Sequence, residues 1–544
     1  MVFFSGCGKS GSDPNPPPDP PASFNFTALR VNGSFNGFEY KGINKRPIVR
    51  LSFDVPLEKT STASSITIKS AAGPIVNYSI QFLNNDSTVQ IIPSTDLNPL
   101  SQYTVTASTT LKSAKNGSLR TAVSVILKTA IDSSDKFPRI SDDALLDLVQ
   151  KNNFKYFYDF GHPASGLARE RNSSGDLVTS GGSGMGIMAI IVGIHRNFIS
   201  RDEGLVRIQK ITEFLSTKAE RFHGAYPHWL NGNTGKTIPF SADDNGADLV
   251  ETSYLVAGLL TARQYFNQNN TTENKLRADI NAIWNGVDWD WFRREGQQVL
   301  YWHWSPDKGW AMNMKIQGWN ECLITYVLAA ASNTHTIPAT VYTEGWARNG
   351  AMKNGNSFYG RTLPLGPAYG GPLFLAHYSF LAINPNQLKD GYAEYDEQVQ
   401  AHTLINHDYC AENPRQFYGY SDSCWGLTAS DNFNGYSAHS PTNDIGVIAP
   451  TAALSSFPYT PQQSMAALQF FYYKLGDKLW KDYGFVDAFS LDKPWFADSH
   501  LAIDQGPIVI MIENYRSGLI WNLMMSAPEI KTGLVKLGFT SPNL

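Results

Sequence analysis

Three acidic residues at the start of one apolar segment have a spacing that suits acid–base chemistry. Asp244, Asp248 and Glu251 are separated by four and then three positions within residues 239–266. A helix turns about 100° per residue, so this spacing places the three carboxyl groups on one stripe of a predicted helix. Like charges one turn apart destabilise a helix by about 0.2–0.5 kcal/mol. The cluster therefore indicates either a capped, solvated helix end or a site that uses carboxyl groups.

A second apolar segment, residues 498–521, also carries acids. Asp504 and Glu513 interrupt a run that is otherwise apolar and aromatic. Cleavage of a glycosidic bond needs one carboxylic acid that protonates the leaving oxygen and one carboxylate that activates water or attacks the sugar. We therefore expect acids from the two segments to face one cleft.

An aromatic loop, residues 299–321, separates these two segments. It ends at Glu321 and contains Trp302, His303, Trp304, Trp310 and Trp319. Sugars stack their C–H faces on aromatic rings, so these side chains are expected either to line a cleft or to close the core. Glu321 is predicted to begin a helix, where the helix dipole favours an acid. In an aromatic pocket its carboxyl group would be desolvated, and the raised pKa would suit a general acid.

Three further polar and aromatic groups are candidates for binding sugar hydroxyls. They contain Arg169 in residues 161–172, His377 beside Tyr378, and Trp425 with Asp431 in residues 418–431. For Arg169 a structural role in a buried Arg–Glu pair is the alternative. The glycine-rich residues 181–186 lack the lysine and the preceding strand of a phosphate-binding loop, which argues against a nucleotide site.

Composition narrows the class of protein. The 544 residues are 42% hydrophobic and 17% charged with a net charge of −4, which indicates a globular chain that does not bind nucleic acid. Aromatic residues make up 12%, which suits a carbohydrate cleft. The four cysteines have no zinc-binding spacing, so no metal and no cofactor are expected. Cys410 and Cys424 could form a disulfide, whereas Cys322 is expected inside a helix as a small core residue.

The N-terminal segment predicts a location. The sequence FSGC at residues 4–7 resembles a bacterial lipobox, and residues 8–21 form a Gly, Ser, Asp and Pro tether. Only six residues precede Cys7, too few for a full apolar signal region, so residues 1–21 are interpreted as a signal remnant with its tether. We expect an outer-membrane lipoprotein in the periplasm or at the cell surface, anchored through a lipidated Cys7.

Two folded domains are predicted after the tether. Residues 22–131 contain short alternating runs separated by turns, typical of a β-sandwich. After a short linker, helical patterns dominate residues 138–544, at roughly 141–160, 183–198, 201–221, 245–268, 271–286, 317–332, 370–381, 389–410, 447–456, 461–476 and 505–524. This number of helices fits one (α/α)6 toroid. A HEAT-like solenoid is the alternative, although its connections would be shorter and more regular.

Long phrases in both domains resemble known families. RLSFDVPLEKTS and STVQIIPSTDLNPLSQYTVTAS resemble a bacterial Ig-like domain, which implies a spacer or accessory role. The phrases ETSYLVAGLLTARQYF, QGWNECLITYVLAAAS, CWGLTASD, GVIAPTAAL, LWKDYGFVDAF and IDQGPIVIMIENYRSGLIW resemble the bacterial glycoamylase-like domain, glycoside hydrolase family 144. That resemblance implies an (α/α)6 toroid that hydrolyses β-1,2-glucan with inversion, either internally or by releasing sophorose from a chain end.

The resemblance also implies which residues form the site. The important acids fall on Asp244, Asp248, Glu251, Glu321 and Asp504, with Glu321 expected as general acid and Asp504 as general base. The segment ADDNGADLVET has more acids than the family pattern, so which of them aligns with which stays open. The expected substrate-binding set is Arg169, Trp302, His303, Trp304, Trp319, His377, Trp425 and Asp431.

Other functions compatible with these features remain as alternatives. The chain could hydrolyse another β-glucan or β-glucoside, or bind glycans as a lipoprotein without cleaving them. A polysaccharide lyase would act on uronates through a cleft lined by Lys and Arg, which the acidic and aromatic motifs do not favour. The expected partner is a glucan or gluco-oligosaccharide. Oligomeric state cannot be read from these motifs, and a monomer is the expectation.

Overall fold

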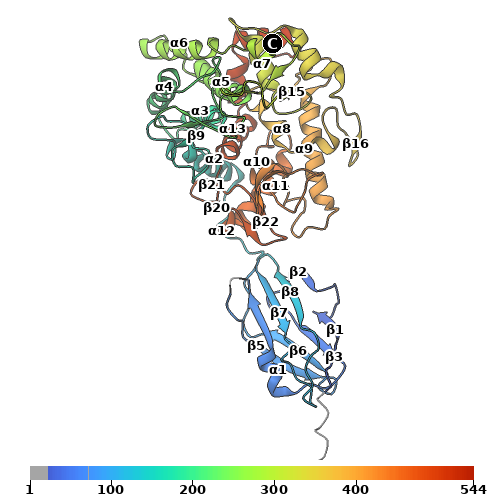
Figure 1. The fold of residues 1–544 in the computed structure, drawn as a ribbon. Coiled ribbons are helices and arrows are strands. Elements are labelled where there is room, and N and C mark those ends of the chain that lie inside the picture. The colour runs from blue at the N-terminus through green and yellow to red at the C-terminus, as the bar shows by residue number, and fades with distance from the viewer. Residues whose placement is uncertain (1–21, 72) are drawn as a thin grey trace, which may run out of the picture. The chain divides into compact units, whose positions relative to one another are not determined.

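The computed structural model describes residues 22–71 and 73–544, so the predicted lipobox and tether of residues 1–21 lie outside the described residues. The chain divides into two compact units, Met1–Asp132 and Ser133–Leu544. The first consists mainly of strands and the second is rich in helices (Figure 1).

Two four-stranded sheets form the smaller unit. One sheet has the order β1 (Phe26–Val31), β3 (Val49–Phe53), β6 (Thr88–Pro93) and β5 (Tyr78–Leu83). The other has the order β2 (Glu39–Ile43), β8 (Val123–Thr129), β7 (Gln102–Ala107) and β4 (Ile66–Ser70), and one short helix, α1 (Lys59–Ser65), precedes β4. All pairs are antiparallel except β2 with β8.

Alternation of side chains explains why these segments are strands. In β3, Val49, Leu51 and Phe53 are buried while Arg50 is exposed. Successive side chains of a strand point to opposite faces, so this period of two gives one apolar face per sheet. The apolar faces supply the buried residues of a separate hydrophobic core for this unit.

The larger unit contains fourteen α-helices among the residues that the structure describes. They are α2 (Asp142–Tyr158), α3 (Ser180–His195), α4 (Arg201–Thr217), α5 (Leu249–Tyr265), α6 (Thr271–Asn285), α7 (Leu323–Ala331), α8 (Phe374–His377), α9 (Tyr395–Glu412), α10 (Pro450–Leu454), α11 (Pro461–Gln469), α12 (Gly476–Leu479), α13 (Ala502–Arg516), α14 (Leu519–Met525) and α15 (Pro528–Lys536). The sequence analysis did not predict α12 or α15, and it merged α13 with α14. Short helices carry too few turns for a clear apolar period.

Short strands lie in the long loops between these helices. They are β9 (Leu177–Thr179), β10 (Trp229–Asn231), β11 (Thr237–Ile238), β12 (Ala247–Asp248), β13 (Leu300–Tyr301), β14 (His303–Trp304), β15 (Lys315–Ile316), β16 (Ser357–Phe358), β17 (Arg361–Thr362), β18 (Ala429–Asn432), β19 (Gly435–Ala438), β20 (Trp480–Lys481), β21 (Gly484–Phe485), β22 (Phe489–Ser490) and β23 (Trp495–Phe496). Their pairing brings distant loops together: β10 pairs with β9, and β12 with β14.

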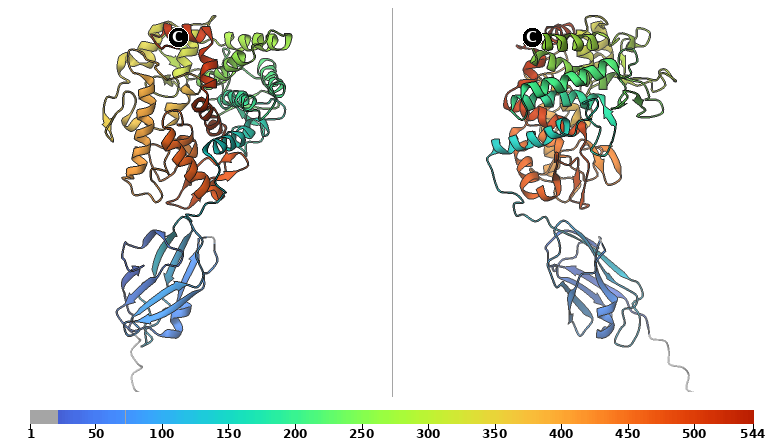
Figure 2. Two further views of the ribbon diagram at one scale, coloured as in Figure 1. Left: turned by 180° about the vertical axis from the view of Figure 1, so that it is seen from behind. Right: turned by 90° about the vertical axis from the view of Figure 1, so that its left-hand side faces the viewer.

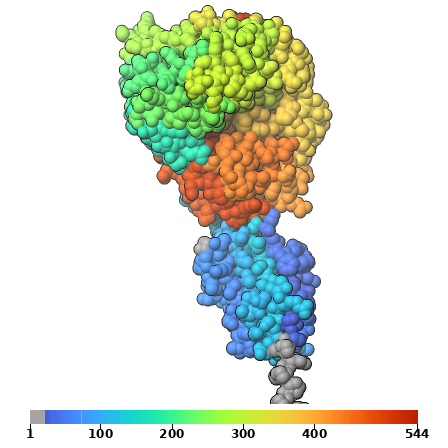
Figure 3. All heavy atoms as spheres, in the orientation of Figure 1, coloured from blue at the N-terminus to red at the C-terminus, as the bar shows by residue number. Residues whose placement is uncertain are grey.

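Three helices form the interior of the larger unit. Almost every residue of α3, α5 and α13 is buried. Helix α13 packs on α2, α3 and α10, and opposite views show it in the middle of the unit (Figures 1 and 2). At the surface, segments coloured green to yellow-green lie beside the orange and red C-terminal segments (Figure 3). Loops from both halves of the sequence can therefore contribute to one site.

Glycines explain how closely α3 and α5 approach each other. A Cβ atom on Gly184 would lie 2.1 Å from the carbonyl oxygen of Tyr254, and one on Gly258 would lie 2.3 Å from the carbonyl oxygen of Gly184. The glycine-rich residues 181–186 are thus part of a helix that contacts another backbone.

We predict that Gly184→Ala destabilises the larger unit by about 1–3 kcal/mol, because overpacking forces α3 and α5 apart. Gly391→Ala is the matched control, since a Cβ atom there meets nothing within 4 Å. All 13 tryptophans lie beyond residue 132, so tryptophan fluorescence during denaturant unfolding reports on the larger unit alone. Equal unfolding midpoints for the two variants would show that this contact does not limit the packing.

Two expectations about the acid-bearing segments were wrong. Helix α5 begins at Leu249, so Asp244 lies outside it and does not share a helical stripe with Glu251. The reason is the Asp248 side chain, which accepts hydrogen bonds from the backbone N–H groups of Val250 and Glu251 and ends the preceding extended segment.

Glu513 also does not face a common cleft with Asp504. Its carboxylate accepts hydrogen bonds from Arg196 Nε at 2.6 Å and Nη2 at 2.8 Å, and its side chain is fully buried. A carboxylate is stable in a buried position only when it is paired with a cation, and the bidentate contact with Arg196 supplies that cation. Glu513 therefore joins α3 to the C-terminal end of α13.

The three cysteines of the larger unit are all buried. Cys410 and Cys424 are buried free thiols, and Cys322 lies just before α7 instead of inside it. Within the described part of the chain, none of the helices combines the length and hydropathy needed to cross a bilayer.

Candidate active site

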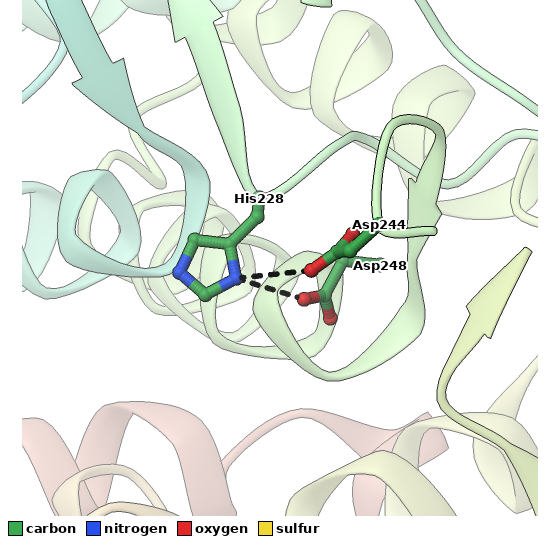
Figure 4. Close-up of side chains that lie close together, drawn as sticks. All are labelled: His228, Asp244 and Asp248. Carbon is green, nitrogen blue, oxygen red and sulfur yellow. Dashed lines mark hydrogen bonds and ion pairs between the residues drawn. The ribbon is translucent and has the colours of Figure 1, made fainter. Parts of the chain in front are cut away.

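Paired loops assemble the first group of polar side chains, which we call the histidine–acid cluster: His228, Asp244, Asp248, Glu251 and His303. Antiparallel pairing of β12 with β14 sets Asp248 opposite His303. His228 immediately precedes β10, and its Nδ1 atom faces the carboxyl groups of Asp244 and Asp248 (Figure 4). Two short strands and the start of α5 therefore fix these side chains.

The histidine nitrogens of the cluster lie within ion-pair distance of the aspartate oxygens. His228 Nδ1 lies 3.1 Å from Asp248 Oδ2 and 4.0 Å from Asp244 Oδ2. His303 Nε2 lies 3.4 Å from Asp244 Oδ2 and 3.6 Å from Asp248 Oδ2. Burial alone would lower the pKa of His228, but the carboxylates of Glu251, Asp248 and Asp244 outweigh it and raise the pKa to about 9.

The two aspartates of the cluster differ in protonation. Burial and the neighbouring Asp248 raise the pKa of Asp244 to about 7. Burial also acts to raise the pKa of Asp248, but the hydrogen bond from His228 and the charge of His303 hold this pKa below its usual value. Asp248 is therefore the permanent anion and Asp244 the acid that can gain or lose a proton.

These groups could also hold a cation. One ligand atom each from His228, Asp244 and Asp248 lies within 4.8 Å of the other two. Nitrogen and carboxylate ligands of this kind suit several divalent metals. However, a protonated His228 already places a positive charge beside Asp248, so the cluster can reach charge balance without a metal.

Glu251 lies one turn into α5 and points toward α3. Its Oε2 atom accepts a hydrogen bond from Gly181 N at 2.8 Å and one from Thr179 Oγ1 at 3.4 Å. A side chain on Gly181 would clash with this carboxyl group. Burial raises the pKa of Glu251 despite these donors and the nearby His228.

Glu321 lies two residues before α7, which begins at Leu323 and not at Glu321 as predicted. Its backbone carbonyl accepts hydrogen bonds from Tyr254 Oη at 3.1 Å and Ser379 Oγ at 2.5 Å, which anchor the segment. Burial raises the pKa of Glu321 to about 7, helped by the charges of Glu251 and Asp248. Its carboxyl group thus holds a proton near neutral pH.

A second group, the aspartate cluster, consists of Asp431, Asp487 and Asp504. The backbone of residues 170–172 brings it together, because Arg171 pairs with Leu501 and the Ala502 N–H donates to Glu170 O just before Asp504. Arg171 Nη1 then contacts Asp431 Oδ2 at 3.1 Å, while Asp431 N donates to Asp487 Oδ2 at 2.6 Å.

Two of these aspartates are almost fully buried. Asp487 is 1% exposed and Asp504 is 2% exposed, and their carboxyl groups are hydrogen-bonded to each other. Burial and the neighbouring Asp431 raise the pKa of Asp487 to about 7. Burial, followed by the charge of Asp487, raises the pKa of Asp504 well above its usual value. The pair therefore competes for a proton.

Two adjoining cavities connect the clusters. The Glu251 cavity, of about 410 Å³, is lined by Glu251 and His228 on one side and by Leu501 and Ile503 on the other. The Asp431 cavity, of about 660 Å³, contains Asp431 and Ser499 in its wall. Arg171 and Tyr436 line both cavities, so the two cavities lie on either side of these side chains.

Two family models match parts of the chain. Residues 313–528 match the Glycoamylase family, described as "Putative glucoamylase", and residues 27–128 match the Bacterial Ig-like domain family. A solved structure of an endo-β-1,2-glucanase from Chitinophaga pinensis, in complex with sophorotriose and glucose, is 52% identical, with a TM-score of 0.73. The alignment covers 75% of this chain and 100% of that one.

The chain belongs to the Glycoamylase family. A β-1,2-glucanase structure from Parabacteroides distasonis is 38% identical, with a TM-score of 0.72, over 95% of this chain and 73% of that one. An exo β-1,2-glucooligosaccharide sophorohydrolase (non-reducing end) from the same species is 46% identical over 443 residues, which are 77% of this chain and 61% of that protein. The present chain thus spans about three fifths of the length of this curated relative.

In this Glycoamylase-family chain the predicted aromatic loop lies beside the first cluster but lines neither cavity. Trp302 stacks on His303 with ring centroids 5.5 Å apart, and Trp304 packs edge-on against Trp291 at 5.4 Å. Trp319 is buried against Phe380. These rings therefore pack beside the histidine–acid cluster and do not line a cavity.

Three residues expected to bind substrate have structural contacts instead. His377 is buried and shares a hydrogen bond of 2.9 Å with Ser456 Oγ, and burial lowers its pKa to about 3. Trp425 is fully buried. Arg169 donates to the carbonyl oxygens of Gly175 and Phe160. None of the three side chains lines either cavity, which is also true of Glu321 and Asp504, and their role in substrate binding stays a prediction.

Arg171 and Tyr378, which belong to segments that the sequence analysis singled out, line the cavities. The sequence analysis missed four other lining residues: His228, Trp229, Phe240 and Tyr436. Phe240 stacks on His228 with ring centroids 4.3 Å apart and lies 4.7 Å from Trp229, which forms an aromatic wall. A usable signal was present for Phe240 alone, since it lies four residues before Asp244 in the same loop.

Proposed function

We propose that this chain is a glycoside hydrolase that cleaves β-1,2-glucan, internally or by releasing sophorose from a chain end. One observation carries the proposal: Glu251 and His228 of the histidine–acid cluster line a cavity whose walls include Trp229, Phe240 and Tyr436, in a chain similar to enzymes named for β-1,2-glucan. Such a cavity provides both stacking surfaces for sugar rings and the two carboxyl functions that hydrolysis needs.

In the proposed mechanism Glu321 is the general acid and Asp504 the general base. Glu321 gives its proton to the glycosidic oxygen as the C1–O bond breaks. Asp504 draws a proton from water on the opposite face of the sugar, directly or through a sugar hydroxyl, and the water oxygen bonds to C1 with inversion. The raised pKa of Glu321, about 7, supports its role, because a donor must be protonated at the working pH.

The proposed set of acids also includes Asp244, Asp248 and Glu251. Asp248 orients His228 and His303 beside the cavity. Burial, together with the negative charges of Glu251 and Asp248, raises the pKa of Glu321 and so keeps it protonated. Asp431 holds Arg171 in the wall of both cavities, where we propose that its guanidinium donates to sugar hydroxyls. We further propose that the helices of the larger unit form an (α/α)6 toroid around this site.

A product assay tests the proposed function. Purified protein is incubated with linear β-1,2-glucan, laminarin, a cellulose-type glucan and starch, and products are followed by chromatography over time. We expect products from β-1,2-glucan alone, as a ladder for internal cleavage or as sophorose for attack at a chain end. Turnover of another substrate without products from β-1,2-glucan would overturn the substrate assignment, and binding without turnover would favour a glycan-binding lipoprotein.

The pKa of Glu321 predicts an alkaline limit to activity. Above about pH 7 its carboxyl group loses the proton that the leaving oxygen needs, so kcat/KM should fall about tenfold per pH unit. Initial rates on β-1,2-glucan between pH 5 and pH 9 measure this limb. An activity that is constant up to pH 9 would exclude Glu321 as the proton donor.

The proposed location rests on the lipobox-like FSGC and the tether that follows it. We propose that Cys7 carries a lipid and anchors a monomeric enzyme at the outer membrane. When a full apolar signal region is placed before Phe4 and the protein is expressed in a bacterial host, detergent phase partitioning should place it in the detergent phase and its Cys7→Ser variant in the aqueous phase. Sedimentation of detergent-free Cys7→Ser at the mass of a dimer would contradict the monomer.

A further inference from the structure

Two buried carboxyl groups in the aspartate cluster contact each other. The Asp487 N–H donates to Ser499 O and the Gln505 side chain donates to Phe485 O, which brings the segments of Asp487 and Asp504 together. The two carboxyl groups share a hydrogen bond, and each is at most 2% exposed. In the described part of the chain, no backbone or side-chain donor reaches Asp487 Oδ1 or Asp504 Oδ2. Two ionised carboxylates cannot hydrogen-bond to each other, so one member of the pair must carry a proton.

The surroundings decide which member carries the charge. Asp487 Oδ2 accepts a hydrogen bond from Asp431 N at 2.6 Å, and such a donor stabilises an anion. Asp431 is itself fixed by Arg171 Nη1 at 3.1 Å and by Ser499 Oγ at 2.5 Å. No comparable donor reaches the Asp504 side chain among the described residues. The proton therefore resides on Asp504 and the charge on Asp487.

We propose that Asp487 is a positioning residue that acts through Asp504. Asp487 receives the proton that Asp504 carries before the reaction, so that Asp504 can accept a proton from water. The proposal rests on the proposed function, in which Asp504 faces the attacking water. As the water O–H bond breaks, its proton bonds to one Asp504 oxygen while the proton already on Asp504 moves to Asp487. The water oxygen bonds to C1, the C1–O bond breaks, and the leaving oxygen takes the Glu321 proton.

Charges balance in this step. The Asp487–Asp504 pair changes from one negative charge to none, and Glu321 changes from neutral to negative. Without Asp487, a protonated Asp504 could not accept a second proton, and it would have to ionise first. The two buried acids thus act together as one base, which holds one proton and can accept one more. Closely coupled carboxyl groups titrate in this way, as a pair.

The groups that act electrostatically on the pair come from four neighbouring elements. They are Asp431 and Tyr436 on β18 and β19, Arg171, Tyr156 on α2, and Tyr378 at the end of α8. The tyrosines are neutral below pH 8, because burial raises their pKa values. Asp431 and Arg171 form an ion pair with each other, so Asp487 is the neighbouring anion that most affects Asp504.

Asp487→Asn tests the proposal by its pH–rate profile. The amide keeps a side chain of equal size but removes the negative neighbour and supplies a donor to Asp504. Both changes favour ionised Asp504, so the acid limb of kcat/KM on β-1,2-glucan should move to lower pH by about one unit or more. At neutral pH kcat should fall by about 3- to 10-fold, because ionised Asp504 with a lowered pKa is a weaker base, while KM changes by less than about threefold.

Asp444→Asn is the matched control. Asp444 is also a buried aspartate, but it accepts hydrogen bonds from Tyr409 and Tyr420 and lines neither cavity. Its substitution should leave the shape of the pH–rate profile unchanged. A purely structural role for Asp487 would lower activity in Asp487→Asn at every pH without moving the acid limb, and that result would overturn the proposal.

A second readout does not depend on the substrate. Acids whose pKa is raised in the folded state bind more protons than in the unfolded state, so stability falls as pH rises from the unfolded pKa near 4 through the folded value of about 7. Asp487→Asn should flatten this fall in denaturant unfolding followed by tryptophan fluorescence, whereas Asp243→Asn, at a loop residue whose side chain is 44% exposed, should leave the fall unchanged. If wild-type protein fails to cleave β-1,2-glucan, the proposed function is wrong, and an unchanged pH slope in Asp487→Asn would separately refute the shared proton.

Discussion

Replacing Glu321 by Gln should abolish hydrolysis of β-1,2-glucan while the protein still binds gluco-oligosaccharides. The amide has nearly the same shape but cannot give a proton to the leaving oxygen. A general acid contributes about 10²- to 10⁴-fold, so we expect kcat to fall by at least about a thousandfold. The fold should persist, because the hydrogen bonds that anchor this segment are made by the Glu321 backbone carbonyl and not by its side chain.

Steady-state rates and calorimetric binding of sophorotriose give the two quantities needed. Glu344→Gln is the control, since Glu344 is an exposed glutamate in another part of the larger unit and should retain full activity. Loss of binding together with turnover in Glu321→Gln would indicate a role in holding the sugar. Retained turnover would remove Glu321 from the mechanism and make another acid of the histidine–acid cluster the donor.

The largest effect on stability is expected for Asp248→Ala. Asp248 is fully buried, caps α5 and contacts His228 and His303. Removing one partner of a buried ion pair costs about 3–5 kcal/mol, because the other charge stays buried without compensation. Loss of the helix cap adds about 0.5–2 kcal/mol. We therefore expect a loss of at least about 3 kcal/mol in the free energy of unfolding of the larger unit.

Asp243→Ala provides the comparison. Asp243 precedes Asp244 in the same loop, but its side chain is 44% exposed and its contact with Lys308 Nζ is a surface ion pair. Such pairs contribute about 0–1 kcal/mol. Denaturant unfolding followed by tryptophan fluorescence should separate the two variants clearly. Similar unfolding midpoints would mean that Asp248 is not the residue on which the cluster depends.

Periodicity located the long helices, but it could not locate their ends where a side chain caps the backbone. Residues 239–266 have enough apolar positions to predict one helix. In the structure the helix begins only at Leu249, because the Asp248 side chain caps it there. The same limit applies to Glu321, which lies outside α7 because the chain turns at Asn320, whose side chain accepts from Cys322 N. Capping depends on side-chain rotamers that spacing does not encode.

Residue types located part of the candidate site, and pairing between distant loops supplied the remainder. Asp504 was recognisable as an acid in an apolar run, whereas Asp487 lies in an aromatic segment with no pattern of its own. Its nearness to Asp504 depends on contacts with Asp431 and Ser499 that only the folded chain makes. Similarly, Arg171 reaches the cavities because it pairs with Leu501, more than three hundred residues away.

The most direct test of the account is the anomeric configuration of the first product, followed by proton NMR during hydrolysis of linear β-1,2-glucan. An inverting reaction by Glu321 and Asp504 predicts that the α-anomer of the new reducing end accumulates first and then converts to the equilibrium mixture. Early accumulation of the β-anomer would contradict a general base at Asp504 and require a covalent intermediate. Absence of any new reducing end would contradict the proposed activity itself.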